Sequence, residues 1–415
     1  MDKNIFIAKN PWRIGRLPPT PTLTRPIYEQ VIELCHDPAV LLVFGPRRAG
    51  KTTLLRELAR RLISTQKALP DQVFYLDLDT MDCADILSNV GSLLQFCEID
   101  PVHPPQDLTY ILIDEIQRLE DPGLLLKAIY DMELPIRVVV TGSSAFGLRV
   151  KVRQSLVGRS RSLFLWPLSP PEIPFNKEYI GWGGFPEVLL AKNDAQRQEY
   201  LANMWAAYVD REIGGFLKVQ KMDRFRSFSE LLAAQTGQLV NLNEFSNTLM
   251  VSRDTVSRYL AYLQESFLVR DLRPFTTNRR GELSKMPKIF FTDLGLLNLL
   301  QGQPANLMNI QRGPILENAV EITIRSFGGD LYFWRTDRGA EVDFVWQNHG
   351  KLVPIEVKSA AISRPTVSRG YRNFLKIYKP EKGILVNETL DSEVKVEDTL
   401  IRFIPFKSFV GFLAG

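Results

Sequence analysis

Cysteine, long apolar runs and an excess of charge of one sign are all scarce in this 415-residue sequence. Its three cysteines show no metal-ligand spacing and are not even in number, which excludes a disulfide framework and argues against a structural zinc site. The longest apolar stretches, such as 39–44, are far shorter than the roughly 18 residues that span a bilayer. The N-terminus also has no apolar stretch of signal-peptide length. We therefore expect a cytoplasmic protein without membrane contact.

The charge balance is nearly even, because 51 Lys and Arg stand against 47 Asp and Glu, a formal net charge of +4. This balance excludes a polybasic coat for nucleic acid. With 45% apolar residues the chain can bury sizeable cores, and its length predicts two to four domains.

Short apolar runs separated by helix-patterned segments fill the first part of the chain. They lie at residues 39–44, 73–78, 110–114, 137–141 and 162–166. Buried runs that alternate with helices of this kind predict repeated βαβ units and a parallel sheet covered by helices. A cluster of four prolines at 167–174 is expected to end this α/β domain.

The segment after the first run reads G-P-R-R-A-G-K-T-T, a complete phosphate-binding loop of the form G-x-x-x-x-G-K-[ST]. Glycines let the backbone wrap closely round phosphates with its N–H groups pointing inward. Lys51 is predicted to reach the β- and γ-phosphates, and Thr52 to bind Mg²⁺ through its hydroxyl, at the positive end of the next helix. The predicted ATP-binding residues are Gly45, Pro46, Arg47, Arg48, Ala49, Gly50, Lys51, Thr52 and Thr53. The competing interpretation is a glycine-rich turn without a ligand.

Two adjacent carboxylates stand where the third run ends. Asp114 ends that run and Glu115 comes next. A carboxylate at the carboxyl end of a buried parallel strand can hold Mg²⁺ through its water shell, and Asp114 has that predicted role. Glu115 is the predicted catalytic residue that orients and polarises the attacking water. The alternative is a pair of acids that cap the next turn.

A hydroxyl after the fourth run can hydrogen-bond the γ-phosphate or the attacking water. Thr141 is the first choice and Ser143 the second, against the alternative of a strand-to-loop cap. Residues 145–165 then carry five basic residues and no acid. Arg159 is favoured as an arginine finger that reaches a neighbouring subunit's γ-phosphate. A solvated basic loop that touches nucleic-acid backbone is the other interpretation.

The chain resembles prokaryotic AAA-plus ATPases that carry a C-terminal domain long known only as one of unknown function. The resemblance starts near residue 25 and rests on these motifs in this order: GPRRAGKTT, YLDLD, ILIDEIQ, VVVTGSS, VGR with WPLSPPE, and GGFPE. It implies an α/β P-loop core with a helical lid, a winged helix, and a C-terminal α/β domain of the PD-(D/E)XK restriction-endonuclease type. The expected domains are an N-terminal arm (1–39), the ATPase core (40–175), a helical lid or linker (176–238), the winged helix (239–310) and the endonuclease-like domain (311–415). The stretch 210–216 departs from the family's common form.

The winged-helix prediction rests on a short helix over 243–249, a turn, a second helix over 252–267 and an apolar strand. The second helix of such a motif enters the major groove, with Val256, Leu260 and Leu263 expected to face inward. The predicted DNA contacts, all expected to face outward, are Arg253, Thr255, Ser257 and Arg258. Between 239 and 290, eight Lys and Arg stand against five Asp and Glu, a smaller excess than a strong DNA reader carries. A protein-contact module is therefore the alternative.

Carboxylates recur after residue 313, where the pattern predicts a helix over 314–327 and three strands. Glu356 and Lys358 lie on one face of a strand because side chains alternate with period two, and Asp343 is expected on the adjoining strand. With Glu317 on the preceding helix, they match the D…ExK arrangement that binds Mg²⁺ and cleaves phosphodiesters. The alternatives are an ordinary half-buried strand, or a domain that keeps the fold as a binding platform.

The expected function is Mg²⁺-dependent binding and hydrolysis of ATP by a homo-oligomer, a hexamer among the candidates. ATP turnover is expected to drive DNA remodelling or processing, and nuclease activity stays open. The alternative is a nucleotide-dependent signalling or defence switch whose non-catalytic C-terminal domain binds protein partners. A non-catalytic scaffold is the third hypothesis.

Overall fold

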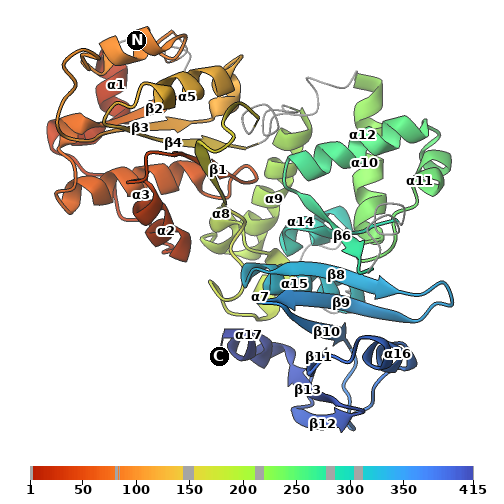
Figure 1. Ribbon diagram of the computed structural model, residues 1–415. Coiled ribbons are helices and arrows are strands. Elements are labelled where there is room, and N and C mark those ends of the chain that lie inside the picture. The colour runs from red at the N-terminus through yellow and green to blue at the C-terminus, as the bar shows by residue number, and fades with distance from the viewer. Residues whose placement is uncertain are drawn as a thin grey trace. The chain divides into compact units, whose positions relative to one another are not determined.

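The computed structural model describes residues 3–79, 83, 85–143, 154–210, 219–276, 286–302 and 312–414. The chain forms two compact units, residues 1–166 with 265–267 and residues 167–264 with 268–415 (Figure 1). Among the described residues, no helix is long and apolar enough to cross a membrane. The basic residues predicted at 149, 151 and 153, and most of the divergent stretch 210–216, lie outside the described residues.

A five-stranded parallel sheet forms the first unit, with strand order β2-β3-β4-β1-β5. Its strands are β1 (Val40–Phe44), β2 (Val73–Asp77), β3 (Thr109–Asp114), β4 (Ile136–Gly142) and β5 (Ser160–Phe164). Each overlaps one of the five apolar runs, so the predicted α/β parallel sheet is confirmed. The fifth strand begins two residues before the run that predicted it.

Helices cover both faces of this sheet. They are α1 (Lys3–Lys9), α2 (Pro26–Leu34), α3 (Lys51–Ser64), α4 (Val90–Phe96) and α5 (Pro122–Asp131). Side chains of β1 alternate between two cores: Leu41 and Val43 pack with α2 and α3, whereas Leu42 and Phe44 pack with α4 and α5. Burial on both faces explains why the strands read as continuous apolar runs.

The predicted N-terminal arm packs against the edge strand β2. The side-chain amide of Asn10 donates to the carbonyl oxygen of Tyr75 at 3.0 Å and accepts the Tyr75 N–H at 2.7 Å. The Trp12 indole N–H donates to the carbonyl oxygen of Val73 at 3.1 Å. These bonds satisfy backbone groups that an open sheet edge would otherwise expose.

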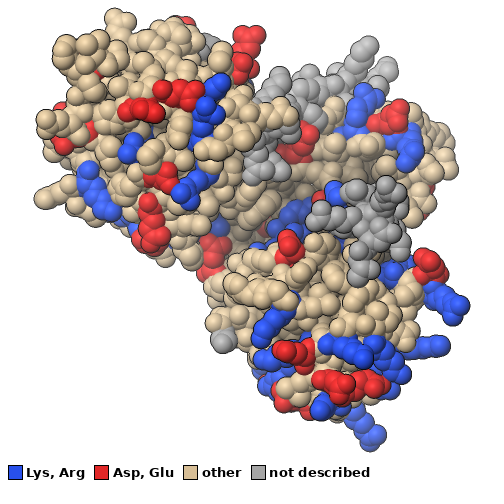
Figure 2. All heavy atoms as spheres, in the orientation of Figure 1, with Lys and Arg blue, Asp and Glu red and all other residues tan. Residues whose placement is uncertain are grey.

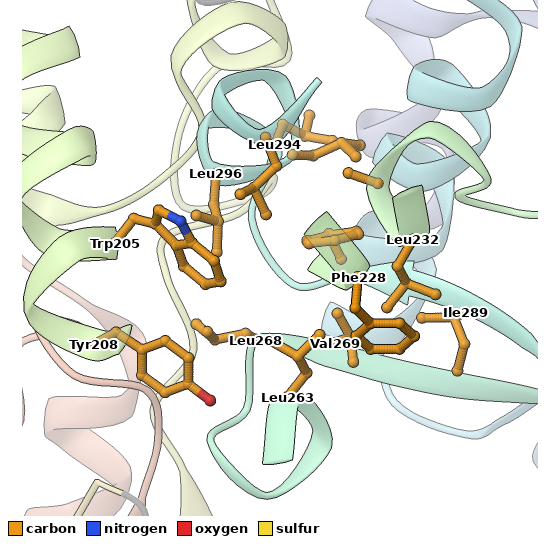
Figure 3. Packing of buried hydrophobic residues seen from close by; sticks show 14 of the residues in the cluster. Trp205, Tyr208, Phe228, Leu232, Leu263, Leu268, Val269, Ile289, Leu294 and Leu296 are labelled. Atoms are coloured by element: carbon orange, nitrogen blue, oxygen red, sulfur yellow. The ribbon is translucent and has the colours of Figure 1, made fainter. Parts of the chain in front are cut away.

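Helices dominate the first half of the second unit. They are α7 (Lys177–Trp182), α8 (Pro186–Leu189), α9 (Asp194–Tyr208), α10 (Val219–Ala234), α11 (Leu242–Leu249), α12 (Arg253–Glu265) and α14 (Leu294–Leu300). Their shared core is rich in aromatic side chains (Figure 3). Trp205 and Tyr208 of α9 stack with ring centroids 5.6 Å apart, and Phe228 of α10 lies against Ile289.

An eight-stranded mixed sheet completes the second unit, in the order β12-β13-β11-β10-β9-β8-β6-β7. Its strands are β6 (Val269–Pro274), β7 (Lys288–Phe291), β8 (Asp330–Arg335), β9 (Glu341–Asn348), β10 (Lys351–Val357), β11 (Lys382–Asn387), β12 (Ser392–Val396) and β13 (Thr399–Pro405). The helices of this part are α15 (Arg312–Ser326), α16 (Arg369–Tyr378) and α17 (Phe406–Ala414). The pairing of β6 with β8 makes one continuous sheet from segments on either side of residue 311.

Candidate functional site

The phosphate-loop sequence lies where the motif requires it, between β1 and α3. Gly50 is the N-cap of α3 with φ 99°, a conformation that favours glycine. A Cβ at Gly45 would lie 2.1 Å from the carbonyl oxygen of Leu165, so only glycine fits there. The guanidinium of Arg25 donates to the carbonyl oxygen of Ala49 at 3.2 Å and supports the loop from outside. Arg25 was not among the residues predicted from the sequence.

Lys51 is buried at the start of α3. Its ammonium group donates to the carbonyl oxygens of Gly45 and Pro46, at 3.0 and 2.9 Å. A buried cation at the N-terminus of a helix, directly after a glycine-rich loop, suits an anionic ligand.

Asp114 organises the hydroxyl groups beside the loop. This buried carboxylate accepts hydrogen bonds from Thr52 at 2.6 Å and Tyr75 at 2.9 Å, and also from the hydroxyl of Thr141. Burial, with the charge of Asp114 next to it, raises the pKa of Tyr75 and keeps its phenol a donor. The hydroxyl of Thr52 and the carboxylate of Asp114 are hard oxygen donors of the kind that Mg²⁺ prefers.

Glu115 follows Asp114 with a left-handed backbone, φ 59° and ψ 49°. Its carboxylate accepts a hydrogen bond from Ser143 at 2.9 Å and another from the side-chain amide of Gln117. The same Gln117 amide donates to the Ser143 oxygen at 2.9 Å, so the three side chains form one network. Gln117, two residues beyond Glu115, was missed in the sequence.

The two hydroxyl candidates have different surroundings. Thr141 is fully buried, and its oxygen donates to Asp114 and accepts the Glu115 N–H at 3.2 Å. Both roles of this hydroxyl orient the carboxylates. Ser143 instead contacts the Glu115 carboxylate directly.

Arg159 lies at the amino ends of the strands, whereas the phosphate loop follows the carboxyl end of β1. It precedes β5, and its carbonyl oxygen accepts the N–H of Val40, the first residue of β1. Because the loop follows the far end of this five-residue strand, Arg159 is about 16 Å along the sheet from it. Its guanidinium pairs with Asp131 at 2.7 Å. Arg159 thus does not reach the phosphate loop of the same chain.

The C-terminal carboxylates meet where β9 and β10 run side by side. Asp343 comes one residue before Phe344, and Glu356 one residue after Ile355, where Phe344 and Ile355 are a registered pair of these antiparallel strands. Asp343 accepts the Val357 N–H at 2.8 Å, whereas Glu356 pairs with Lys358 at 2.5 Å and accepts from Ser368 at 3.0 Å. Among the described residues, no three or more His, Cys, Asp or Glu are arranged to hold a metal ion.

Glu317 of α15 belongs to the same electrostatic cluster. Burial raises the pKa of Glu317, and the charge of Asp343 raises it further. Burial likewise raises the pKa of Asp343, and the positive charge of Lys288 opposes the shift at both carboxyls. Lys288 is a buried residue of β7 that pairs with Glu341 at 2.5 Å. The sequence did not predict this cation, because it comes from another segment of the chain.

The structure corrects one of the predicted outward residues of α12. Thr255 is buried, and its hydroxyl lies 2.8 Å from that of Ser252. The buried face is centred on the fully buried Tyr259 rather than on Leu260, which is half-buried, and this rotation turns Thr255 inward. The other three predicted contacts, Arg253, Ser257 and Arg258, are exposed.

Comparison with protein families divides the chain into three matched segments. Residues 37–173 match a model described as "AAA domain", and residues 175–307 and 312–409 match two separate domains of unknown function.

Curated relatives cover most of the chain. An uncharacterized protein of Mycobacterium tuberculosis is 27% identical over 350 residues, which is 82% of this chain and 74% of that protein. An uncharacterized protein of Haemophilus influenzae is 25% identical over 398 residues, which is 91% of this chain and 96% of that protein.

Among solved structures, domain III of the replication initiation protein DnaA of Thermotoga maritima is 14% identical. Its TM-score is 0.27, over 70% of this chain and 100% of that one. A score this low supports no statement about fold or function. The phosphate loop and the parallel sheet both lie within residues 37–173, the segment that is similar to the AAA domain.

Proposed function

We propose that the chain binds ATP with Mg²⁺ at residues 45–53 and hydrolyses it, and that turnover drives work on DNA through the second unit. The observation that carries the proposal is the network in which Asp114 accepts from Thr52 while Glu115 is held beside it. The family matches meet near residues 174 and 308–311, and a single match spans both the expected helical lid and the expected winged helix.

Each residue of the network has a role that follows from its place. Lys51 and the loop N–H groups bind the phosphates. Thr52 and Asp114 would hold Mg²⁺, which would supply positive charge beside the phosphates. Glu115 orients a water molecule, which attacks the γ-phosphorus as the bond to the β-phosphate oxygen breaks. The proton of the water passes to the Glu115 carboxylate.

Two substitutions separate binding from hydrolysis. Lys51→Ala is expected to abolish ATP binding, measured with a fluorescent nucleotide. Glu115→Gln is expected to keep the parent affinity and to lower steady-state turnover by at least about 100-fold. Turnover by Glu115→Gln at the parent rate would refute the assigned role of Glu115.

The DNA part of the proposal is tested by the same turnover assay with single-stranded, duplex and branched DNA at two salt concentrations. Stimulation that falls with salt is expected for a DNA-coupled motor. A cleavage product that needs Mg²⁺ and disappears in Asp343→Ala would add nuclease activity.

A nucleotide-dependent switch is the second candidate, favoured by the C-terminal cluster. Lys358 and Ser368 engage Glu356, and the Val357 N–H engages Asp343, so both carboxylates already have polar partners within the domain. Copurification with ADP and turnover indifferent to every DNA would support the switch over the motor.

Arg159 bears on the proposed oligomer. Because it lies away from the phosphate loop of its own chain, it would act on a neighbouring subunit's nucleotide. Arg159→Ala is expected to lower turnover without lowering ATP affinity, and mixing it with Glu115→Gln is expected to restore part of the turnover. In the mixture, the Arg159→Ala subunits supply an intact Glu115, and the Glu115→Gln subunits supply the arginine. No recovery on mixing would remove Arg159 from the site.

A further inference from the structure

A row of basic side chains follows the exposed face of α16. Tyr371, Phe374 and Leu375 are buried and fix the orientation of the helix. The opposite face and the C-cap present four exposed basic residues at spacings of three, four and three, which is the spacing of one stripe along a helix. The stripe consists of Arg369, Arg372, Lys376 and Lys379, and it is about 15 Å long.

The positive charge of residues 364–382 is mostly uncompensated by acidic residues of the same segment. Residues 364–382 contain six Lys or Arg and one Glu, a net charge of +5, which exceeds the +4 of the whole chain. The remainder of the chain therefore sums to −1. Within the described part of the chain, Lys376 pairs with Glu397 at 3.7 Å, whereas Arg369, Arg372 and Lys379 have no acidic partner within 4.0 Å. Basic and acidic side chains lie interspersed on the face of the molecule around α16 and β12 (Figure 2).

The helix predicted from sequence to enter the major groove lacks such an excess. Residues 252–265 carry two basic and two acidic residues, so α12 and its N-cap have no net charge. Phosphate contacts supply most of the affinity of a protein for DNA backbone, and they need Lys or Arg. The charge favourable to DNA therefore lies on α16 rather than on α12.

We propose that the α16 stripe is the surface that contacts the phosphates of duplex DNA. The proposal rests on the DNA role proposed above and assigns it to a surface. Ser368, the N-cap of α16, donates to Glu356 at 3.0 Å, so the stripe begins beside the β10 carboxylate. A DNA backbone lying along the stripe therefore passes that edge of the sheet.

The test measures binding of the full-length chain to a fluorescent 30-base-pair duplex by anisotropy across a salt series. The triple variant Arg369→Ala, Arg372→Ala, Lys379→Ala is expected to bind about tenfold more weakly. It should also flatten the slope of log affinity against log salt by about 2.7, since each phosphate contact contributes about 0.9. Thermal unfolding and ATP affinity are expected to match the parent, because the three side chains are exposed.

Two controls locate the effect. Arg253→Ala with Arg258→Ala on α12 should change the affinity by less than about twofold. The triple variant Lys177→Ala, Lys192→Ala, Arg224→Ala removes the same charge from other exposed positions of the second unit, and its affinity should stay near that of the parent.

Equal binding by the α16 variant and the parent would overturn the assignment, as would an equal loss in the charge-matched control. Binding of single-stranded RNA or of vesicles rich in anionic lipid as tightly as duplex DNA would overturn the choice of partner. A parent chain that ignores duplex DNA would refute both this inference and the proposed DNA role. Binding that survives in the α16 variant refutes the inference alone.

Discussion

At the scale of single residues, one buried carboxylate orders the candidate nucleotide site. Asp114 accepts from hydroxyl groups on three elements, those of Thr52, Tyr75 and Thr141. A hydrogen bond to a charged group is worth about 1.5–3 kcal/mol, so three of them fix the carboxylate firmly. Glu115 lacks that support and depends instead on Ser143 and Gln117.

Gln117 is therefore expected to act as a positioning residue. Gln117→Ala removes a donor to the Glu115 carboxylate. Turnover should fall by about 10- to 100-fold, which corresponds to the free energy of one hydrogen bond to a charged group, and ATP affinity should be unchanged. The measurement is a comparison of kcat with the nucleotide dissociation constant.

The neighbouring Arg118→Ala is the matched control, because Arg118 is exposed and pairs only with the exposed Asp79 in the described structure. Turnover should stay within about twofold of the parent. Equal losses in both variants would point to a general disturbance of the loop rather than to positioning of Glu115.

At the scale of elements, the GGFPE motif joins two parts of the second unit. Gly184 donates its N–H to Asp293, the N-cap of α14, and its carbonyl oxygen accepts the Leu168 N–H at 2.8 Å. A Cβ at Gly184 would lie 1.7 Å from the carbonyl oxygen of Leu168, and one at Gly183 would lie 2.3 Å from the Asp293 carboxylate. The glycines are thus explained by packing.

Gly184→Ala is expected to lower the free energy of unfolding by about 3 kcal/mol or more, because backbone must move to admit the methyl group. Urea denaturation measures this loss. Gly411→Ala is the control: a Cβ there meets open space within α17, so stability should stay the same or rise by less than about 1 kcal/mol.

Asp293 gives the second unit a predictable pH dependence. Burial raises its pKa to about 6 from 3.8, although the backbone N–H groups it accepts from oppose the shift. The folded state therefore binds the proton more tightly than the unfolded state. Protonated Asp293 makes its full contribution to the free energy of unfolding below about pH 4. That contribution, about 3 kcal/mol, is lost as the pH rises to about 6.

Urea denaturation from pH 4 to 7, compared with Asp293→Asn, checks this sign. The unfolding free energy of the parent, relative to that of the variant, should be higher at pH 4 than at pH 7. A difference that stays constant with pH would show that Asp293 titrates alike in both states.

At the scale of the whole molecule, the second unit cannot be divided cleanly near residue 311. Strand β8 pairs with β6, and Phe290 of β7 packs against Phe344 of β9 with ring centroids 5.6 Å apart. The charge cluster spans the same boundary, because Lys288 of β7 pairs with Glu341 of β9.

A fragment of residues 312–415 is therefore expected to be less stable than the same residues within a fragment of 167–415. It exposes the edge of β8 and loses Phe290 from its core, a loss of about 3 kcal/mol or more. The two fragments are compared by urea denaturation followed through tryptophan fluorescence. Coincident midpoints would show that the contacts across residue 311 do not stabilise residues 312–415.

Some features followed from the sequence because their signals are local. The alternation of apolar runs and helix-patterned segments predicted the parallel sheet, and the loop around Lys51 was recognised from nine consecutive residues. Strand periodicity likewise brought Asp343 and Glu356 to adjoining strands, as the register of β9 and β10 has them.

Other features depended on which segments meet in space. Tyr75 reaches Asp114 only because β2 is next to β3, and Lys288 reaches Glu341 only because β7 joins the C-terminal sheet. The buried face of α12, which includes Thr255, is fixed where Tyr259 packs against Phe225 and Phe228 of α10. Local periodicity is written into consecutive residues, whereas a partner across the fold is chosen by strand order and burial, which no short stretch of sequence contains.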